Sequence, residues 1–194
     1  MKLTISADID LAGSRWVTRL EARVADGNRV AMVARLAVVH VGEMADALGE
    51  LGPTMKDAQL EAVHDLYFED GWYKDDYADG AGIDLLFVES ITLAEGMEDR
   101  DLDLAVIRRI ADTLGSGCQL VVRPYRNALE AARWARLGFS VSTHGRTAGL
   151  MHLKLGQRNA DIVQDESGVY EIRSNGAAIE AFTAPSSLRR RACN

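Results

Sequence analysis

The chain has 194 residues, a hydrophobic fraction of 47% and a formal net charge of −7 at pH 7. This length and composition suit one domain with an appendage and a full apolar core. No run of 18 apolar residues occurs, so we expect no membrane span. The N-terminal segment lacks the features of a signal peptide, and the two cysteines make no disulfide framework, so we expect a cytoplasmic protein.

The charge is unevenly distributed along the chain. Residues 57–103 carry 15 acidic and 2 basic side chains, whereas residues 104–194 carry 7 acidic and 13 basic ones. An acidic segment disfavours nucleic acid as a partner and favours a cationic substrate or a basic partner. A solvated acidic helix and loop is the alternative interpretation.

The first part of the chain predicts strands. Residues Leu3 to Ile9 alternate between apolar and polar, and the apolar runs Trp16 to Val24 and Arg29 to Val41 are joined by a turn that contains Asp26 and Gly27. Asp-Gly between two such runs indicates a hairpin. His40, near the end of the last run, is expected to be a packed or rim residue rather than a base.

Helices and a loop follow. The pattern predicts a short helix over Met44 to Leu51 and a second over Met55 to Phe68, capped by Thr54. Residues 71–82 form an acidic loop that carries Trp72, Tyr73 and Tyr77. Aromatic rings among carboxylates can hold an amine through cation–π and charge interactions. Anchoring of the loop to the core by these rings is the alternative.

The middle of the chain predicts a strand, an acidic turn, a helix, a strand and a helix. Leu85 to Leu93 and Cys118 to Val122 are short, apolar and rich in β-branched residues. An amphipathic helix runs from Leu102 to its stop at Gly115, and a second one occupies Ala128 to Phe139, stopped by Gly138.

This order, with the ending Trp134-Ala-Arg-Leu-Gly138-Phe139, resembles the GNAT superfamily of acetyl-CoA-dependent N-acetyltransferases. In that family a strand ends in an Arg/Gln-x-x-Gly-x-Gly/Ala loop that opens a helix, and a later helix ends in Tyr-x-x-x-Gly-Phe. The resemblance spans roughly Thr18 to Leu155. It implies an α/β fold with a mixed, mostly antiparallel sheet flanked by helices. It also implies acetyl-CoA as donor and an acceptor amine bound near the acidic segment.

The signature loop departs from the family pattern. Aligning Arg-Gly-x-Gly-x-Gly with Glu98 to Asp103 replaces the arginine by Glu98 and the three glycines by Asp99, Asp101 and Asp103. A helix N-terminus attracts anions through unpaired N–H groups, and glycines permit their close approach. A carboxylate about 4 Å from a phosphate would cost on the order of 4 kcal/mol before screening. We therefore expect a degenerate phosphate loop whose CoA site is lost or greatly weakened, which puts acetyl-CoA binding in question.

The same aspartates are also candidate metal ligands. Asp99-x-Asp101-x-Asp103 begins like a calcium-binding loop, but the glycine and the distal glutamate of such a loop are replaced by Leu104 and Ile110. We therefore expect no metal site.

The resemblance also assigns residues to roles. Glu89 corresponds to the general base, and Tyr125 is a neighbouring substitute for the family's tyrosine acid, whose position holds Trp134. The remaining implied residues would hold the donor: the strand backbone at Ile91 and Leu93, the loop and helix start at Arg100, Leu102 and Asp103, and Asn127. From the residues alone, a structural role for Glu89 and a helix-capping role for Asn127 stay open.

The C-terminal part predicts two hairpins. Residues 140–155 are expected to turn near His144 and Gly145, Arg158 to Gly168 to form a linker, and a second hairpin to turn at Ser174 to Gly176, followed by a basic end. This assigns residues 1–156 to a GNAT-like domain and residues 157–194 to a linker, a hairpin and a tail. The extra hairpin can extend the sheet or mediate homodimer contacts.

Two functional hypotheses follow. The first is an N-acyltransferase that moves an acetyl group from acetyl-CoA to an unidentified amine through an atypical donor site. The second is a non-catalytic GNAT-fold binding or regulatory protein whose acidic face holds a basic partner.

Overall fold

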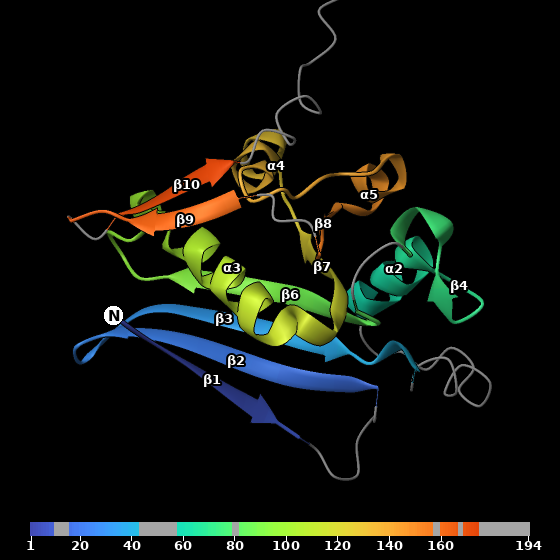
Figure 1. The fold of residues 1–194 in the computed structure, drawn as a ribbon, viewed down its shortest axis with the longest axis horizontal. Coiled ribbons are helices and arrows are strands. Elements are labelled where there is room, and N and C mark those ends of the chain that lie inside the picture. Colours follow the sequence, from blue (N-terminus) through green and yellow to red (C-terminus); the bar gives the residue numbers. More distant parts are fainter. Residues whose placement is uncertain (10–15, 43–57, 79–81, 157–159, 167–168, 175–194) are drawn as a thin grey trace, which may run out of the picture.

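A mixed sheet of six strands, in the order β1-β2-β3-β6-β7-β8, organises the molecule (Figure 1). The structure is a computed structural model that describes residues 1–9, 16–42, 58–78, 82–156, 160–166 and 169–174. The strands are β1 (Lys2–Asp8), β2 (Val17–Asp26), β3 (Arg29–Val39), β6 (Asp84–Leu93), β7 (Cys118–Pro124) and β8 (Leu150–Lys154). Neighbouring strands are antiparallel except β6 and β7, which run parallel.

Helices cover both faces of this sheet (Figure 1). They are α2 (Ala58–Tyr67), α3 (Leu102–Leu114), α4 (Ala128–Ala135) and α5 (Thr143–Ala148). Helices α3 and α4 contribute to one core cluster, and α2 contributes to a second cluster on the opposite face. The α/β architecture with a mixed, mostly antiparallel sheet is therefore confirmed.

The central strands carry apolar side chains on both faces, because helices cover both faces of the sheet. On β6, Leu86 and Val88 belong to the core beneath α3, whereas Leu85 and Phe87 belong to the core beneath α2. This alternation explains why the strand reads as a continuous apolar run rather than as an alternating one. No helix among the described residues is long and apolar enough to cross a membrane.

Between α2 and β6 the chain forms two short strands and a 3-10 turn. Helix α2 ends at Tyr67, and Phe68, expected in the helix, begins a two-residue strand, β4 (Phe68–Glu69), that pairs with β5 (Trp72–Tyr73). A 3-10 turn, η1 (Asp75–Tyr77), follows. The predicted helix Met44 to Leu51 and the cap Thr54 lie outside the described residues.

Two predicted boundaries change after β7. Helix α4 ends at Ala135 rather than Phe139, because its last turn tightens: Leu137 N donates to Trp134 O at 3.0 Å and Gly138 N to Ala135 O at 2.9 Å. The hairpin expected around His144 and Gly145 is wrong, since these residues lie in α5.

Local hydrogen bonds explain why α5 forms. The Ser142 hydroxyl accepts a hydrogen bond from Gly145 N at 2.9 Å and caps the helix, and Gly149 ends it with φ of 68°. The chain then enters β8, which pairs with β7, and His152 of β8 also forms an antiparallel bridge with Ser140, before α5.

The extra C-terminal hairpin is present but uses different strands. Residues predicted as linker form β9 (Ala160–Gln164), which pairs with β10 (Tyr170–Ser174). β10 covers the first of the two runs predicted around Ser174 to Gly176, and the rest of that predicted turn, with the run after it, lies outside the described residues. Ile172 packs this hairpin against the α3 side of the core. The division into residues 1–156 and 157–194 stays a prediction.

Candidate active site

The parallel strands β6 and β7 part after a short pairing. The paired residues of β6 run from Asp84 to Phe87, opposite Cys118 to Val122 of β7. At the same point β6 bulges against β3: Arg35 opposes Ser90 and the next residue, Leu36, opposes Val88, which makes Glu89 the extra residue. Over Val88 to Leu93, none of the described strands therefore pairs with the β7-facing edge of β6.

This edge offers backbone donors and acceptors to a ligand. Ile91 and Leu93, expected to hold the donor through their backbone, lie on it. Their side chains are half-buried against the core beneath α3, so the backbone is the part of them that the edge presents. Unpaired N–H and C=O groups need partners, which water or an extended ligand can supply.

Glu89 lies at the bulge among charged groups. Its carboxylate forms an ion pair with Arg19 of β2, and its side chain is 19% exposed. A depression of about 320 Å³ adjoins it, lined also by Glu21 and Arg35. The sequence predicts a partly apolar setting for Glu89, and Leu20 and Leu36 line the depression together with these charged side chains.

The segment that the sequence predicts to be a degenerate phosphate loop forms a 3-10 turn, η2 (Glu98–Arg100), followed by Asp101 in the left-handed region with φ of 51°. Helix α3 then begins at Leu102, and no side chain caps it. Leu102 is 1% exposed and packs into the core, and Arg100 is half-buried at the end of the turn. The backbone N–H groups of the first helical turn thus lack a side-chain acceptor from the N-cap.

The carboxylates of Asp101 and Asp103 point toward arginines at the C-terminal end of α4. Arg133 binds Asp103 with both terminal nitrogens, at 2.5 and 2.6 Å, and also donates to Asp101 at 3.0 Å. Arg136 pairs with the other oxygen of Asp101 at 2.6 Å. We call these four residues the Arg–Asp network. Asp103 is 5% exposed, and its hydrogen bonds raise the pKa of Arg133.

This network changes the electrostatic argument made from the sequence. The carboxylates of Asp101 and Asp103 are compensated by arginines, so the expected simple repulsion of a phosphate is wrong for these two residues. The network already engages the carboxylates of Asp101 and Asp103 with Arg133 and Arg136. Asp101 and Asp103 were also two of the three candidate metal ligands, and both carboxylates are paired with arginines. Among the described residues, no group of three or more His, Cys, Asp or Glu side chains is arranged to hold a metal ion.

Trp134 occupies a structural position. It is 1% exposed, contacts Phe139 edge to face, and lies beneath the guanidinium of Arg123, whose Cζ is 3.8 Å from the ring centroid. Burial lowers the pKa of Arg123 to about 10, opposed by Glu130 and Asp103, so this side chain stays charged at neutral pH. Its Nη1 atom is buried without a hydrogen-bond partner.

Asn127 and Tyr125 lie at the start of α4. Asn127 caps the helix, since its Oδ1 accepts from Glu130 N at 2.9 Å, which fulfils the structural alternative. The Glu130 carboxylate in turn accepts from Arg126 N at 2.9 Å and from Arg123 at 2.6 Å. Tyr125 directly follows β7, is half-buried and packs against the core beneath α3.

His40 ties three strands together, as expected of a packed residue. Its Nδ1 lies 2.9 Å from Asp84 Oδ2 on β6, and its Nε2 lies 2.9 Å from the Thr18 hydroxyl on β2. The second oxygen of Asp84 accepts from Val41 N at 3.3 Å. These contacts fix the start of β6 relative to β2 and β3.

Two aromatic residues of the acidic loop anchor it. Tyr73 donates to the carbonyl of Asp84 at 3.0 Å, and Tyr77 is buried against Tyr67 and His152. Trp72 is 59% exposed. Beside them lies a depression of about 440 Å³ whose carboxylates are Glu69, Asp70, Asp75 and Asp76. Lys74 also lines this depression.

Sequence reasoning missed Arg123, Arg133 and Arg136. The two arginines at 133 and 136 are one helical turn apart, which was a signal that they share a face of α4. Their partners are about thirty residues away in sequence, and only the tertiary fold brings them together.

Comparisons with known proteins give one distant likeness. No family model matches the chain, and no curated protein matches it. Among solved structures, the chain is similar to a mutant of agmatine N-acetyltransferase in its apo form, with a TM-score of 0.40 and 14% sequence identity. The alignment covers 71% of this chain and 76% of that chain.

Proposed function

We propose that the protein is an N-acyltransferase of the GNAT type, with its acyl donor held along the free edge of β6. The observation that carries this proposal is the parting of β6 and β7 at the bulge of Glu89. A parallel pair that opens after four residues leaves an unpaired backbone edge next to a carboxylate and next to an uncapped helix start. These are the groups needed to bind an extended thioester and to deprotonate an amine.

Each residue has a defined role in this proposal. Glu89 takes the proton of the acceptor amine, and Arg19 positions its carboxylate. Backbone groups at Ile91 and Leu93 orient the donor, and Tyr125 returns a proton to the leaving group. Acetyl-CoA would supply the activated acyl group. The carboxylates around Asp75 favour a cationic acceptor.

The Arg–Asp network limits which donors bind well. A diphosphate at the start of α3 must displace Asp101 and Asp103 from Arg133 and Arg136 before these arginines can contact it. Exchange of one charge-assisted pair for another yields little net free energy. The nucleotide part of CoA therefore contributes little affinity, and a donor that lacks it, such as S-acetylpantetheine, performs about as well.

A donor comparison tests this proposal. Acetyl transfer to a panel of primary amines and polyamines is measured with acetyl-CoA and with S-acetylpantetheine. We expect the two donors to have kcat/KM values within about threefold of each other, and Glu89→Gln to lower both by about 10²-fold or more. Glu95→Gln, an exposed glutamate on the loop after β6, is the matched control and should leave both unchanged. Absence of transfer above the uncatalysed rate with either donor would contradict the proposal.

A non-catalytic binding or regulatory protein is the second candidate. The observation that favours it is Trp134, which stands where the GNAT resemblance implies a tyrosine acid and is fully buried beneath Arg123. In that case the Arg–Asp network is structural, and the acidic depression around Asp75 binds a basic partner. Failure of both donors to bind, combined with salt-sensitive binding of a polycationic peptide that Asp75→Asn and Asp76→Asn weaken, would favour this function.

A further inference from the structure

The first strand of the sheet has an unpaired outer edge. Strand β1 pairs with β2 along its whole length, from Lys2 opposite Ala25 to Asp8 opposite Arg19. None of the strands that the structure describes pairs with the other edge of β1, which lies at the rim of the sheet in Figure 1. The backbone N–H and C=O groups along this edge therefore need partners, which water or another strand can supply.

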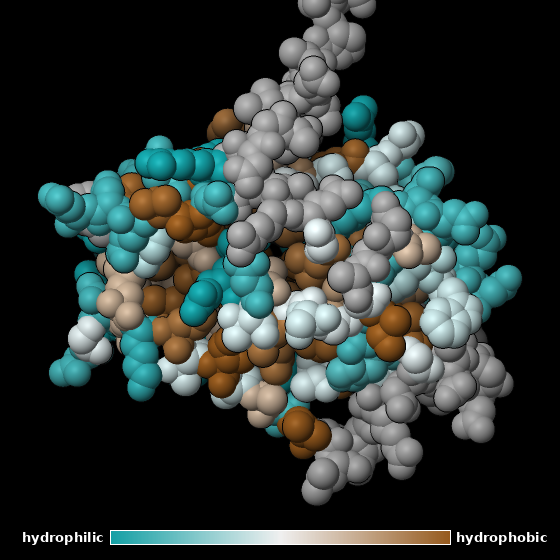
Figure 2. Space-filling model, viewed as in Figure 1, coloured by the Kyte–Doolittle hydropathy of each residue, from teal (hydrophilic) through white to brown (hydrophobic). Residues whose placement is uncertain are grey.

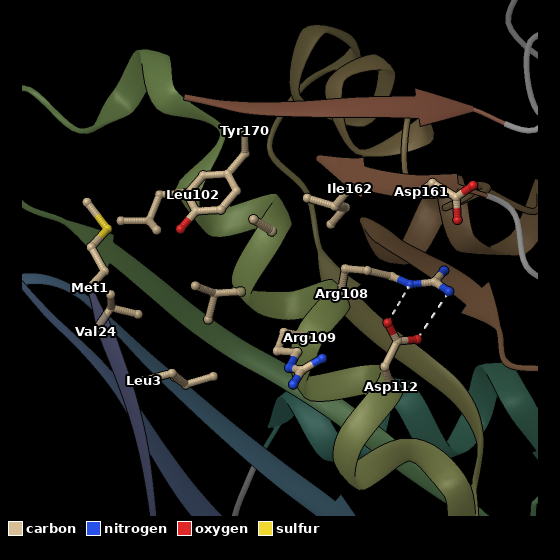
Figure 3. Close-up of a pocket in the computed structure, with 12 residues that line it drawn as sticks. Met1, Leu3, Val24, Leu102, Arg108, Arg109, Asp112, Asp161, Ile162 and Tyr170 are labelled. Carbon is tan, nitrogen blue, oxygen red and sulfur yellow. Dashed lines mark hydrogen bonds and ion pairs between the residues drawn. The ribbon is translucent and has the colours of Figure 1, made fainter. Parts of the chain in front are cut away.

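The two faces of β1 differ in polarity. Leu3 and Ile5 pack against the core beneath α3, and Met1 and Leu3 line a cavity of about 400 Å³ between the first two strands, α3 and the hairpin (Figure 3). The space-filling view shows this side of the molecule, with apolar atoms gathered between the hairpin and the first strands (Figure 2). The side chains on the opposite face of β1 are polar and exposed: Lys2, Thr4, Ser6 and Asp8.

This edge has few of the features that keep edge strands from associating. The stretch from Leu3 to Ala7 contains no charged side chain and no proline, and the pairing of β1 with β2 has no bulge. Met1 and Ile9, at the two ends of the strand, are large apolar residues that are 49% and 67% exposed. A regular, uncharged edge with exposed apolar residues favours pairing with a further strand.

The sequence of β1 is complementary to itself when two copies run antiparallel with Ile5 opposite Ile5 of the second copy. In this register apolar residues face apolar ones, hydroxyls face hydroxyls and opposite charges face each other: Met1 with Ile9, Leu3 with Ala7, Thr4 with Ser6, and Lys2 with Asp8. Each of these pairs occurs twice, because a two-fold axis at Ile5 relates the copies. Opposite charges directly across a strand pair stabilise the pairing, and like charges there destabilise it.

Other registers match less well. A shift of one residue sets apolar side chains opposite polar ones. A shift of two residues places Lys2 opposite Ser6 or Asp8 opposite Thr4, according to its direction, and shortens the pairing. The register with Ile5 on the axis pairs the whole of β1 and sets its two charged residues opposite each other.

We propose that the protein forms a homodimer in which the β1 strands of two copies pair antiparallel across a two-fold axis at Ile5. The two six-stranded sheets then form one continuous sheet. Lys2 and Asp8 form ion pairs between the copies on the polar face, and Met1 becomes covered by Ile9 on the other. One strand pair makes a small interface, so we expect a dissociation constant on the order of 10–100 µM at moderate ionic strength.

Sedimentation velocity of the full chain over about a hundredfold range of concentration tests the proposal. We expect a monomer–dimer equilibrium. Lys2→Glu and Asp8→Lys should each weaken dimerisation by about tenfold or more, because each substitution turns both ion pairs into like-charge pairs. Arg126→Glu makes the same change in net charge as Lys2→Glu, at a side chain that is 90% exposed just before α4, and as the control it should leave dimerisation unchanged.

Restored complementarity tests the register. The double variant Lys2→Glu/Asp8→Lys exchanges the two charges, so its dimerisation should return to within about threefold of the wild type. An equimolar mixture of the two single variants should form a heterodimer, because both charged positions are acidic in one variant and basic in the other. Circular dichroism and a thermal melt establish that each variant is folded.

Four outcomes would each overturn the proposal. They are a wild type that is monomeric over the whole range, single variants that dimerise as the wild type does, a folded double variant that does not recover, and a mixture that stays monomeric. A monomeric wild type would also mean that a second copy is not the occupant of this edge. None of these outcomes depends on acyl transfer, so this proposal and the proposed function fail separately.

Discussion

Arg133 on α4 binds Asp103 in the first turn of α3 through two hydrogen bonds of 2.5 and 2.6 Å. In the GNAT resemblance, Asp103 takes the place of a glycine whose lack of a side chain lets a diphosphate approach the helix. Here a carboxylate points the other way and ties two helices together. The pair is a packing contact between α3 and α4.

Thermodynamic coupling between these two side chains should be large. Asp103→Asn and Arg133→Gln each remove one partner from a charge pair in which Asp103 is almost fully buried. We expect each single variant to lose about 2–3 kcal/mol of unfolding free energy in urea, and the double variant to lose clearly less than the sum. The exposed Arg108–Asp112 pair is the comparison, and Asp112→Asn should cost about 0.5 kcal/mol or less. Additive losses in the double variant would show that the two groups do not interact as described.

Stability should depend on pH through His152. Burial, assisted by Lys154, lowers the pKa of His152 from 6.5 to about 4 in the folded chain. The unfolded state therefore binds a proton at a higher pH than the folded state does. Stability is full above about pH 6.5 and is lost as the pH falls toward 4, by on the order of 3 kcal/mol.

Urea unfolding at a series of pH values measures this loss. His152→Gln should flatten the dependence between pH 6.5 and 4, whereas His144→Gln, on the exposed surface of α5, should retain it. If the His152→Gln variant keeps the full pH dependence, another group is responsible.

The short helix α5 should depend on its cap. Ser142→Ala removes the acceptor of the Gly145 N–H group and should cost about 1 kcal/mol. Gly145→Ala should cost more, because a Cβ there would lie 2.7 Å from the carbonyl oxygen of Leu150. Thr143→Ala, in the first helical position and exposed, serves as control, and a loss equal to that of Ser142→Ala would argue against the cap.

The sequence was informative where a local pattern decides the structure. The parallel strands β6 and β7, the helix α3 and the break at Gly115 follow from residue type and period, and they lie within a few residues of their predicted limits. Helix α5 was missed although Ser142 and Gly149 are ordinary start and stop signals, because His144-Gly145 was interpreted as a turn. Strand β9 was missed because its polar composition resembles that of a linker.

Less of the candidate site than of the fold could be predicted from the sequence. Glu89 could be assigned to its strand, but the bulge and the ion pair with Arg19 depend on two other strands. Likewise, three loop aspartates could be seen to replace glycines, but the direction in which Asp101 and Asp103 point depends on α4. Charge counted along a chain does not reveal which charges are already paired.

The most direct test titrates acetyl-CoA and S-acetylpantetheine into the wild type and into the double variant Asp101→Gly/Asp103→Gly by calorimetry. The variant frees Arg133 and Arg136, gives the helix start room for a phosphate, and relieves the positive φ at Asp101. We predict similar, weak binding of both ligands to the wild type, and a gain of about tenfold or more for acetyl-CoA alone in the variant. Micromolar binding of acetyl-CoA to the wild type, far tighter than that of S-acetylpantetheine, would contradict the proposal that the Arg–Asp network prevents the diphosphate of CoA from binding at the start of α3.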